Sequence, residues 1–397
     1  MSAQYFVTQP TLEDIRERVK GYASWIEVNL DSLGHNLDQV HQRTGVEVIP
    51  CVKGNAYGHG LVPVTAYFME HGITRFLVAK LWEAMQLREA ELSCDVINMD
   101  PLFTAEQYNR IIEKGITQTV YSRKVADQLN RAAMSQGVNA GVFVKVDTGL
   151  NRVGVRHLEA ANLIEYVEHL EGLHVEGIFS TFTESREKDQ KQLERMIKLD
   201  EELKSRGITV PVKSLASGNA VFHFPGSELD AVRPGLMLYG IYPDKEDRES
   251  GIELKQVLTF KARLEHVKII EEGEAVTYSA RFVAPKRMSV GTFHAGYSDG
   301  VPRGLTKKGL VRFKGETRRI LGTVSVNHCI VDVDGLDAEP GDIVEVVSPV
   351  GENTIEKVCE LAGIMTYSYC VALNPLTPRV YMKGGVPVAL SEPRLVD

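Results

Sequence analysis

The sequence predicts a (β/α)8 TIM barrel over residues 31–243, followed by a mainly β domain over residues 244–397 that also takes in a strand at 24–29. Short apolar, β-branched runs alternate with amphipathic helical stretches as far as about Tyr242, and eight such runs can be counted. Beyond Tyr242, strand-like runs separated by glycine and proline take over. A doubly wound parallel sheet would fit the same alternation, so the pattern favours the barrel without excluding that alternative.

The predicted barrel strands are short runs rich in valine, isoleucine and phenylalanine. They are Val46–Lys53, Phe76–Lys80, Val96–Asp100, Gln118–Tyr121, Val142–Asp147, Val175–Phe182, Val212–Ala216 and Leu236–Tyr239. Helices are expected between them. The first begins at Asp31, a suitable N-cap, and places Leu33 and Leu37 on one face. The segment Ser185–Lys204 is so highly charged that we expect an exposed helix there.

The C-terminal part begins with a polar stretch, Pro243–Gly251, that is typical of a linker. Helical periodicity returns only at Thr354–Leu361, and the early run Ser24–Val28 is expected to pair with the C-terminal sheet. The strands predicted for that sheet are Val257–Arg263, Met288–His294, Ile320–Val326, Ile330–Val333 and Ile343–Val347.

Composition excludes several classes of protein. A formal net charge of −8, from 45 basic and 53 acidic side chains, argues against nucleic-acid binding. No apolar stretch approaches the length of a membrane span, and the first ten residues do not have the pattern of a secretion signal. The five cysteines are scattered without metal-type pairing. We therefore expect a cytoplasmic protein with reduced thiols, no membrane partner and no metal site.

Lys53 is the residue whose surroundings most suggest chemistry. It ends a buried apolar run and precedes a glycine-rich turn, in which Tyr57 supplies a hydroxyl group. An amine removed from water can lose its proton near neutral pH and form a Schiff base with a carbonyl group. The pattern taken alone is weak evidence, because a surface lysine beside a turn would give the same sequence.

Five strings of residues together resemble the alanine racemases, enzymes that use pyridoxal 5′-phosphate (PLP) and have a barrel followed by a β domain. VKGNAYGHG at 52–60 resembles the cofactor-lysine signature of that family. The others follow in the family's order, and the resemblance covers about residues 24–385. They are KVDTGLNRVG at 145–154, AVRPG at 231–235 with LYG at 238–240, VTYSA at 276–280, and GYSDG at 296–300.

The resemblance implies a role for each matched residue. Lys53 would hold PLP and serve as one acid–base group, and Tyr278 would be the second, on the opposite face of the cofactor. Arg233 would hydrogen-bond the pyridine nitrogen and Arg152 the substrate carboxylate, while Lys145 matches a lysine that is often carbamylated. In that family the barrel lysine and the β-domain tyrosine meet across a dimer interface. The resemblance therefore also implies an obligate head-to-tail homodimer, with composite active sites that combine Lys53 and Tyr278.

Further matches concern the phosphate and the substrate. Val326 stands where a methionine N–H usually contacts the substrate carboxylate. Glycines suit phosphate contacts made by backbone N–H groups in the loops after the last barrel strands. The residues implied for phosphate binding are Tyr57, Ser217, Gly218, Gly235, Leu236 and Tyr367.

Three departures bear on substrate choice: Thr181 replaces a common histidine, Val326 a methionine and Asn327 an aspartate. The implied function is an amino-acid racemase with alanine as the default substrate; serine, or a basic or branched amino acid, is the alternative. A related PLP decarboxylase is disfavoured because its C-terminal cysteine motif is missing. A non-catalytic PLP-binding protein resembles the barrel alone, so the β domain with Tyr278 counts against it.

Overall fold

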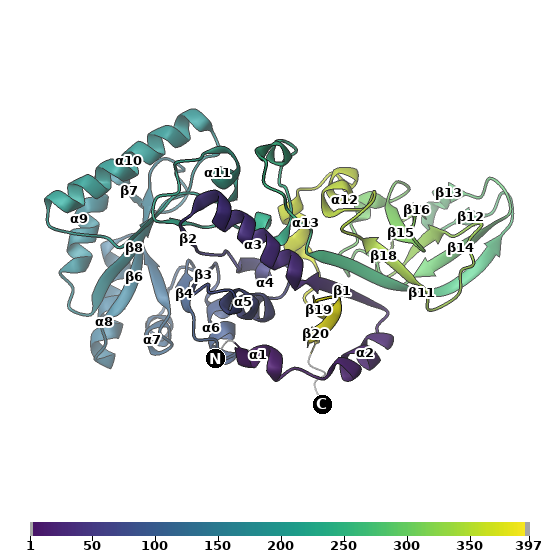
Figure 1. Ribbon diagram of the computed structural model, residues 1–397, viewed down its shortest axis with the longest axis horizontal. Helices are drawn as coiled ribbons and strands as arrows, with labels where there is room; N and C mark the ends of the chain where they lie inside the picture. The colour runs from purple at the N-terminus through teal and green to yellow at the C-terminus, as the bar shows by residue number, and fades with distance from the viewer. Residues whose placement is uncertain (1–2, 394–397) are drawn as a thin grey trace.

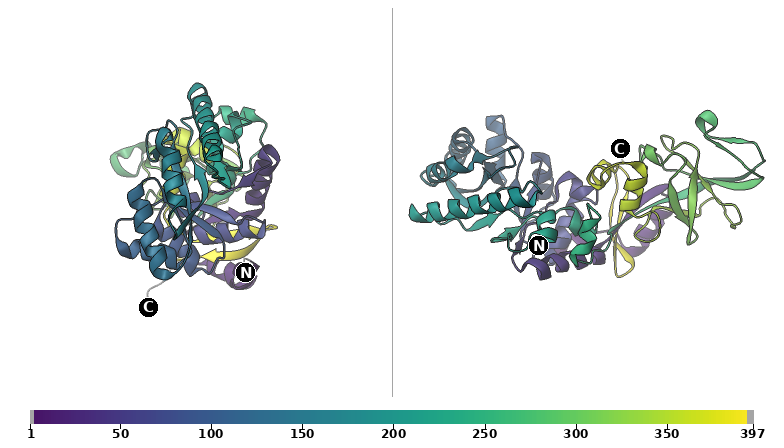
Figure 2. Two further views of the ribbon diagram at one scale, coloured as in Figure 1. Left: turned by 90° about the vertical axis from the view of Figure 1, so that its left-hand side faces the viewer. Right: turned by 90° about the horizontal axis from the view of Figure 1, so that it is seen from above.

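A computed structural model describes residues 3–393 and contains the predicted barrel at one end and a β domain at the other (Figures 1 and 2). Six strands form a parallel sheet in the order β3-β4-β5-β6-β8-β9, and β10 pairs in parallel with β2. Parallel bridges from Cys51 to Leu77 and from Ser217 to Arg233 join these two groups into a ring. The ring strands are β2 (Glu47–Val48), β3 (Arg75–Val78), β4 (Asp95–Asn98), β5 (Thr117–Val120), β6 (Ala140–Asp147), β8 (Leu173–Phe179), β9 (Val212–Ser214) and β10 (Ala231–Val232). The predicted barrel is confirmed.

The eighth strand was predicted at the wrong place. Leu236–Tyr239 forms a 3-10 helix, η1, and the eighth strand is β10, just before it. Pro234 has no N–H for a ladder, and the Gly235 backbone (φ −118°, ψ −107°) turns the chain out of the strand. All four residues of η1 are buried. A buried apolar run of this length looks the same whether it is strand or helix.

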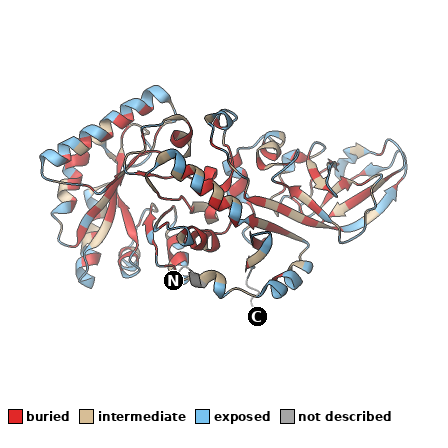
Figure 3. Cartoon of the chain, viewed as in Figure 1, coloured by how far each residue is buried: buried red, intermediate tan, exposed pale blue. Residues whose placement is uncertain are grey.

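Helices cover the outside of the barrel. The predicted cap of the first was wrong by two residues: Asn29, not Asp31, caps α3 by accepting a hydrogen bond from the Ser32 N–H at 2.9 Å. Helix α10 has the predicted exposed side, but an inner stripe that includes Leu193 and Met196 is buried (Figure 3). The helices around the ring are α3 (Leu30–Thr44), α5 (Leu61–Glu70), α6 (Leu81–Glu89), α7 (Ala105–Glu113), α8 (Arg123–Gln136), α9 (His157–Glu168), α10 (Arg186–Ser205) and α11 (Gly218–His223).

The β domain is built on a nine-stranded sheet of order β14-β17-β16-β15-β18-β11-β1-β19-β20, and an additional β14–β11 pairing closes six of its strands into a small barrel. The predicted early strand, β1 (Ser24–Asn29), pairs antiparallel with β11 and parallel with β19, which confirms its place in this sheet. The other strands are β11 (Leu258–Ile270), β14 (Met288–Phe293), β15 (Leu310–Phe313), β16 (Glu316–Leu321), β17 (Cys329–Asp332), β18 (Ile343–Val347), β19 (Arg379–Lys383) and β20 (Val386–Ser391).

Smaller elements complete the chain. The predicted helix near Thr354 is α12 (Ile355–Ala362), with Thr354 as its N-cap. The predicted linker contains a 3-10 helix, η2 (Glu246–Ser250), which the buried Asp247 carboxylate anchors to the His223 Nε2 at 2.6 Å. The remaining elements are α1 (Ala3–Val7), α2 (Leu12–Lys20), α4 (Lys53–Tyr57), β7 (Val155–Arg156), β12 (Ala275–Val276), η3 (Tyr278–Ala280), β13 (Phe282–Val283), η4 (Arg303–Leu305) and α13 (Thr366–Ala372).

The domain limits of 31–243 and 244–397 stay predictions, and residues 394–397 of the second lie outside the described part of the chain. Between residues 3 and 393, no helix has both the length and the apolar character needed to cross a membrane.

Candidate active site at the barrel mouth

Lys53 opens a left-handed turn at the end of the first barrel strand. Gly54, Asn55 and Ala56 have φ angles of 64°, 56° and 52°, and Tyr57 follows with φ 50°. A left-handed backbone costs a residue with a Cβ roughly 1–2 kcal/mol. Three consecutive non-glycine residues keep this conformation only if their surroundings impose it. The half-buried Lys53 side chain therefore leaves the strand in a direction that the tertiary structure fixes.

The buried carboxylate of Glu83 is one part of those surroundings. Its Oε1 accepts hydrogen bonds from the N–H groups of Gly54 at 2.5 Å and Asn55 at 3.3 Å. Its Oε2 accepts from Ala79 at 3.0 Å and Lys80 at 3.1 Å. One side chain thus joins the Lys53 turn to the end of β3. Glu83 was not among the predicted site residues; its only local signal is an acidic residue three positions after Lys80 at a helix start.

Two tyrosines lie beside the Lys53 turn. The rings of Tyr57 and Tyr367 are 6.1 Å apart, and burial raises the pKa of both phenols above the ordinary value, so both keep their protons at neutral pH. A Cβ on Gly235 would lie 2.8 Å from the Tyr57 hydroxyl oxygen, so glycine is required there. Among the described residues, the N–H groups of Gly235 and Leu236 donate no hydrogen bond. These are hydrogen-bond donors of the kind an anion needs.

Ser217 and Gly218 lie in the neighbouring loop. Ser217 forms a parallel bridge with Arg233, so the loops after β9 and β10 run side by side. Both loops lead into a short helix with a glycine at its start: Gly218 is the first residue of α11, and Gly235 directly precedes η1. Both predicted phosphate-binding segments therefore stand at the same end of the barrel as Lys53.

Arg233 is buried on the inner side of these loops. Its Nε donates to the Ser214 hydroxyl at 3.0 Å, and its Nη2 donates to the carbonyl oxygens of Ser180 and Leu215. The guanidinium stacks on the Phe179 ring at 4.9 Å. Burial lowers its pKa to about 10, so it stays charged at neutral pH. Within residues 3–393 its hydrogen bonds use Nε and Nη2, which leaves Nη1 for a ligand.

Lys145 is the most strongly perturbed amine of the site. Its Nζ donates to the Thr181 hydroxyl at 2.7 Å and lies 4.3 Å from the centre of the Phe179 ring. Burial, and then the positive charges of Arg233 and Arg152, lower its pKa well below the ordinary value. Thr181, which departs from the family pattern, is thus the hydrogen-bond partner of Lys145. Arg152 is exposed in the loop after β6.

Tyr278 lies elsewhere, in the β domain. Its side chain is 73% exposed and lines a cleft with Tyr297, Val326 and Asn327. The Thr323 hydroxyl donates to the Tyr278 carbonyl oxygen at 3.2 Å. The 3-10 helix that carries Tyr278 lies between β12 and β13, at the end of the molecule far from the barrel, whereas α4 with Lys53 is central (Figures 1 and 2).

One chain therefore gathers the predicted residues in two separate places. Tyr278 and Val326 share the β-domain cleft, and the Lys53 group occupies the carboxyl ends of the barrel strands, where barrel enzymes bind their ligands. Lysine, arginine, tyrosine and glycine gathered there suit an anionic ligand. Fold and arrangement are those of a (β/α)8-barrel enzyme with an appended β domain.

Comparison with known proteins identifies the family. Residues 28–243 match the alanine racemase N-terminal domain, and residues 257–381 match the alanine racemase C-terminal domain. The alanine racemase of Desulforamulus reducens is 35% identical over 90% of this chain and 98% of that protein. The structure of alanine racemase from Clostridium difficile 630 aligns over 94% of this chain and 98% of that one, with a TM-score of 0.88 and 28% identity. Its complex with cycloserine has a TM-score of 0.86 at the same identity and coverage. The chain belongs to the alanine racemase family and is therefore a racemase, an enzyme of the isomerase class.

Proposed function

We propose that this protein interconverts the L and D forms of an amino acid, with alanine as the default substrate and PLP as its cofactor. The observation that carries the proposal is the barrel mouth, where Lys53 emerges from a constrained turn beside neutral tyrosines and a buried arginine. The structurally similar alanine racemase from Clostridium difficile 630 has been seen in complex with cycloserine, which fits an amino-acid-sized ligand.

The residues present fit PLP. A phosphate needs donors, which the hydroxyls of Tyr57 and Tyr367 and the N–H groups of Gly235 and Leu236 supply. A side chain on Gly235 would crowd the Tyr57 hydroxyl, so the cradle depends on glycine at that position. Ser217 and Gly218 complete the phosphate site from the adjacent loop. PLP, when bound, supplies the electron sink that makes the α-proton of an amino acid acidic.

The chain's own groups then move that proton. Lys53 Nζ serves one face of the substrate and Tyr278 Oη the other, so that a proton removed on one side is returned on the opposite side. Arg233 keeps its proton at neutral pH, so it would donate a hydrogen bond to the ring nitrogen of PLP without protonating it. Arg152 and the Val326 N–H hold the substrate carboxylate.

Lys145 is the candidate for carbamylation. Reaction with CO2 requires a neutral amine, and burial together with the Arg233 and Arg152 charges favours the neutral form of Lys145. A carbamate would turn this amine into an anion between the two guanidinium groups. Without the modification, its contact is the hydrogen bond to Thr181. Intact-mass measurement in bicarbonate distinguishes the two states by the mass of one CO2.

Tyr278 and Lys53 lie in separate places of one chain, so the proposed two-sided proton transfer needs a second copy of the chain. We propose an obligate head-to-tail homodimer in which the exposed Tyr278 of each subunit faces the barrel mouth of the other. Its exposure of 73% leaves the phenol free to enter a partner's site. The absence of a membrane partner and a location in the cytoplasm remain parts of this proposal.

A basic amino acid is a second candidate substrate, because the cleft beside Tyr367 is acidic. Glu184, Asp244 and Asp247 line it, and burial together with the Asp244 charge raises the pKa of Glu184. Lys245 and Arg248 also line the cleft, where they form ion pairs with two further carboxylates, those of Glu360 and Glu356. A cationic side chain would be stabilised in such a cleft.

The test is a panel of single-enantiomer amino acids incubated in deuterium oxide, followed by chiral analysis. Alanine should racemise fastest and gain α-deuterium, and protein with Lys53→Ala should give neither result. Lysine or arginine racemising faster would select the second candidate. A product other than the opposite enantiomer, such as an amine from decarboxylation, would refute the racemase.

A further inference from the structure

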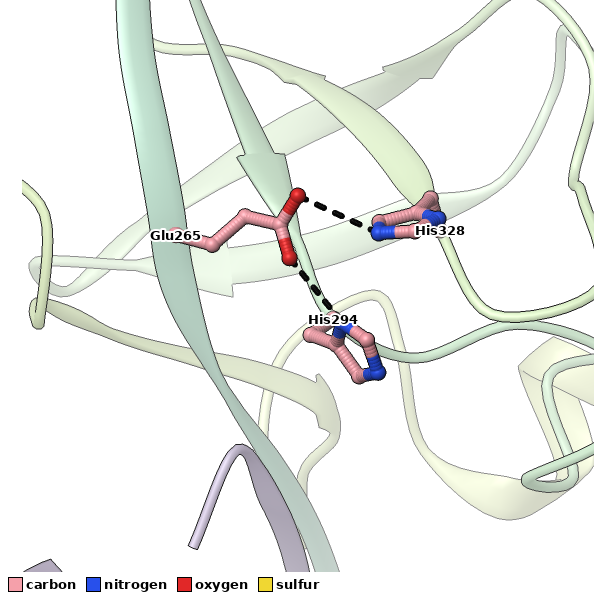
Figure 4. Close-up of side chains that lie close together, drawn as sticks. All are labelled: Glu265, His294 and His328. Atoms are coloured by element: carbon pink, nitrogen blue, oxygen red, sulfur yellow. Dashed lines mark hydrogen bonds and ion pairs between the residues drawn. The ribbon is translucent and has the colours of Figure 1, made fainter. Parts of the chain in front are cut away.

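Three side chains of the β domain converge on one point outside the barrel mouth (Figure 4). The Glu265 carboxylate lies between two imidazoles, with Oε2 at 2.9 Å from His294 Nδ1 and Oε1 at 3.1 Å from His328 Nε2. The two rings meet edge to face with their centres 4.8 Å apart. One nitrogen or oxygen from each of the three residues lies within 4.8 Å of the others.

Backbone pairing explains why these residues meet. Strands β11, β14 and β17 are neighbours in the sheet. The antiparallel pair Phe293–Cys329 places the residue after β14, His294, opposite the residue before β17, His328. The register of β11 against β14 shifts between Leu264 and His266, so Glu265 occupies a β-bulge. A bulge redirects the side chain of its extra residue, here toward the two histidines.

We propose that Glu265, His294 and His328 bind one divalent transition-metal ion of the zinc class. Two imidazoles and one carboxylate are ligands that Zn²⁺ takes at about 2.0–2.2 Å, with water completing the shell. Imidazole favours Zn²⁺, Ni²⁺ and Cu²⁺ over Mg²⁺ and Ca²⁺. Ligands of one tetrahedral ion lie roughly 3.4 Å apart. The Glu265 oxygens, at 2.9 and 3.1 Å from the two imidazole nitrogens, are already close to that spacing.

The exposure of these side chains suits such a site. Each is about two-fifths exposed, at 41% for Glu265, 41% for His294 and 44% for His328. They have room to rotate toward an ion, and solvent can supply the remaining ligand. The alternative is a triad in which the carboxylate accepts a hydrogen bond from each imidazole and no ion binds.

An ion here would act on the cleft that holds Tyr278. His328 ends the turn 325–328, in which the Ser325 N–H donates to the His328 carbonyl oxygen at 3.0 Å, and that turn carries Val326 and Asn327. His328 itself lines the cleft. An ion bound by all three side chains would link this turn to β11 and to the end of β14, and would so fix the position of Val326. An effect of the ion on substrate binding through Val326 rests on the proposed function. The metal site itself does not depend on that proposal.

The test measures Zn²⁺ binding to the purified full-length protein by competition with a chromophoric chelator. We expect one Zn²⁺ per chain and no competition by Mg²⁺. His294→Ala and His328→Ala should each lower the affinity at least about tenfold. Glu265→Gln keeps the size and a hydrogen-bond acceptor of the side chain but loses its charge, so it separates metal binding from simple hydrogen bonding and should also lower the affinity.

His174→Ala is the matched control. His174 is an exposed histidine of β8, and its Nε2 lies 3.7 Å from Glu176 Oε1. This pair offers one imidazole and one carboxylate, whereas the proposed site has two imidazoles. This variant should bind Zn²⁺ as the unaltered protein does. Equal Zn²⁺ binding by the unaltered protein and the His294→Ala/His328→Ala double variant would overturn the proposal, as would unchanged affinity in Glu265→Gln. Zn²⁺ binding by protein with Lys53→Ala should be normal, so a failed metal site and a failed racemase give different results.

Discussion

The barrel mouth and the Tyr278 cleft are built in opposite ways. At the barrel mouth, Lys145 and Arg233 are more than nine-tenths buried and fixed by hydrogen bonds to side chains and carbonyl groups of the neighbouring strands. In the cleft, Tyr278 is 73% exposed, and its segment combines short strands with left-handed residues such as Thr277 and Ser279. The side chains of the first region are fixed within one chain, and the second presents the Tyr278 phenol to solvent.

This difference has a physical meaning. The proposed cofactor needs one fixed orientation, and packing inside the barrel fixes the groups that would hold it. In the proposed mechanism the second proton-transfer group acts from the opposite face, and in one chain Tyr278 lies in the separate β-domain cleft. The proposed dimer therefore divides the site into a part fixed by folding and a part fixed by association.

The largest effect is expected from Tyr278→Phe, which removes one oxygen atom from the exposed region. Turnover should fall about 10²–10⁴-fold, because one of two acid–base groups is lost. Deuterium exchange at the α-carbon should fall strongly from one enantiomer and little from the other. Tyr297→Phe is the matched control, since this phenol lines the same cleft, and its loss should be far smaller. Equal losses from both enantiomers would contradict the two-sided mechanism.

Acid should destabilise the buried region through His59. Its Nδ1 bonds the Tyr57 carbonyl oxygen at 2.9 Å, its ring stacks on Tyr239, and burial lowers its pKa from 6.5 to about 4. The folded state thus binds fewer protons than the unfolded chain between these values. The stability that neutral His59 contributes is complete above pH 6.5 and falls by up to about 3 kcal/mol as the pH approaches 4.

The measurement is the unfolding temperature of the protein at pH 7.5 and pH 4.5. His59→Gln should show a smaller drop between the two than the unaltered protein. The exposed His169, replaced in the same way, should leave the drop unchanged. A drop of the same size in His59→Gln would show that His59 does not carry this pH dependence.

A smaller effect is expected from Glu83→Gln at the Lys53 turn. The carboxylate accepts four backbone hydrogen bonds, and an amide turns one acceptor oxygen into a donor that faces N–H groups. We expect a loss of about 1–3 kcal/mol in stability together with reduced turnover. Glu89→Gln, on the exposed side of the same helix, is the control. Activity that survives intact in Glu83→Gln would show that the turn holds Lys53 without this carboxylate.

Much of the fold could be predicted because it depends on local patterns. Apolar runs of strand length alternate with helical periodicity, so the first seven predicted barrel strands and the predicted early strand each overlap a strand of the structure. The first was predicted too long: β2 covers only Glu47–Val48 of the predicted Val46–Lys53. Leu236–Tyr239 was predicted as a strand and is a 3-10 helix, because burial on all sides removes the periodicity that separates the two. Asn29 rather than Asp31 caps α3, a difference within the usual uncertainty of a helix boundary.

The candidate site was predictable where residues are neighbours in the chain. Strings such as VKGNAYGHG name Lys53 and Tyr57 directly. The role of Glu83 could not be predicted, since its hydrogen bonds join two strand ends that meet only in the fold. The triad of Glu265, His294 and His328 was missed for the same reason, and the sequence led us to expect no metal site.

The most direct test of the divided site is a mixed dimer. One subunit carries Lys53→Ala and the other Tyr278→Phe, each with a different affinity tag, and the heterodimer is isolated by two successive purifications. If each active site takes Lys53 from one subunit and Tyr278 from the other, one site is intact and activity should reach about half that of the unaltered dimer. Activity no higher than that of the two parent homodimers would contradict the composite site.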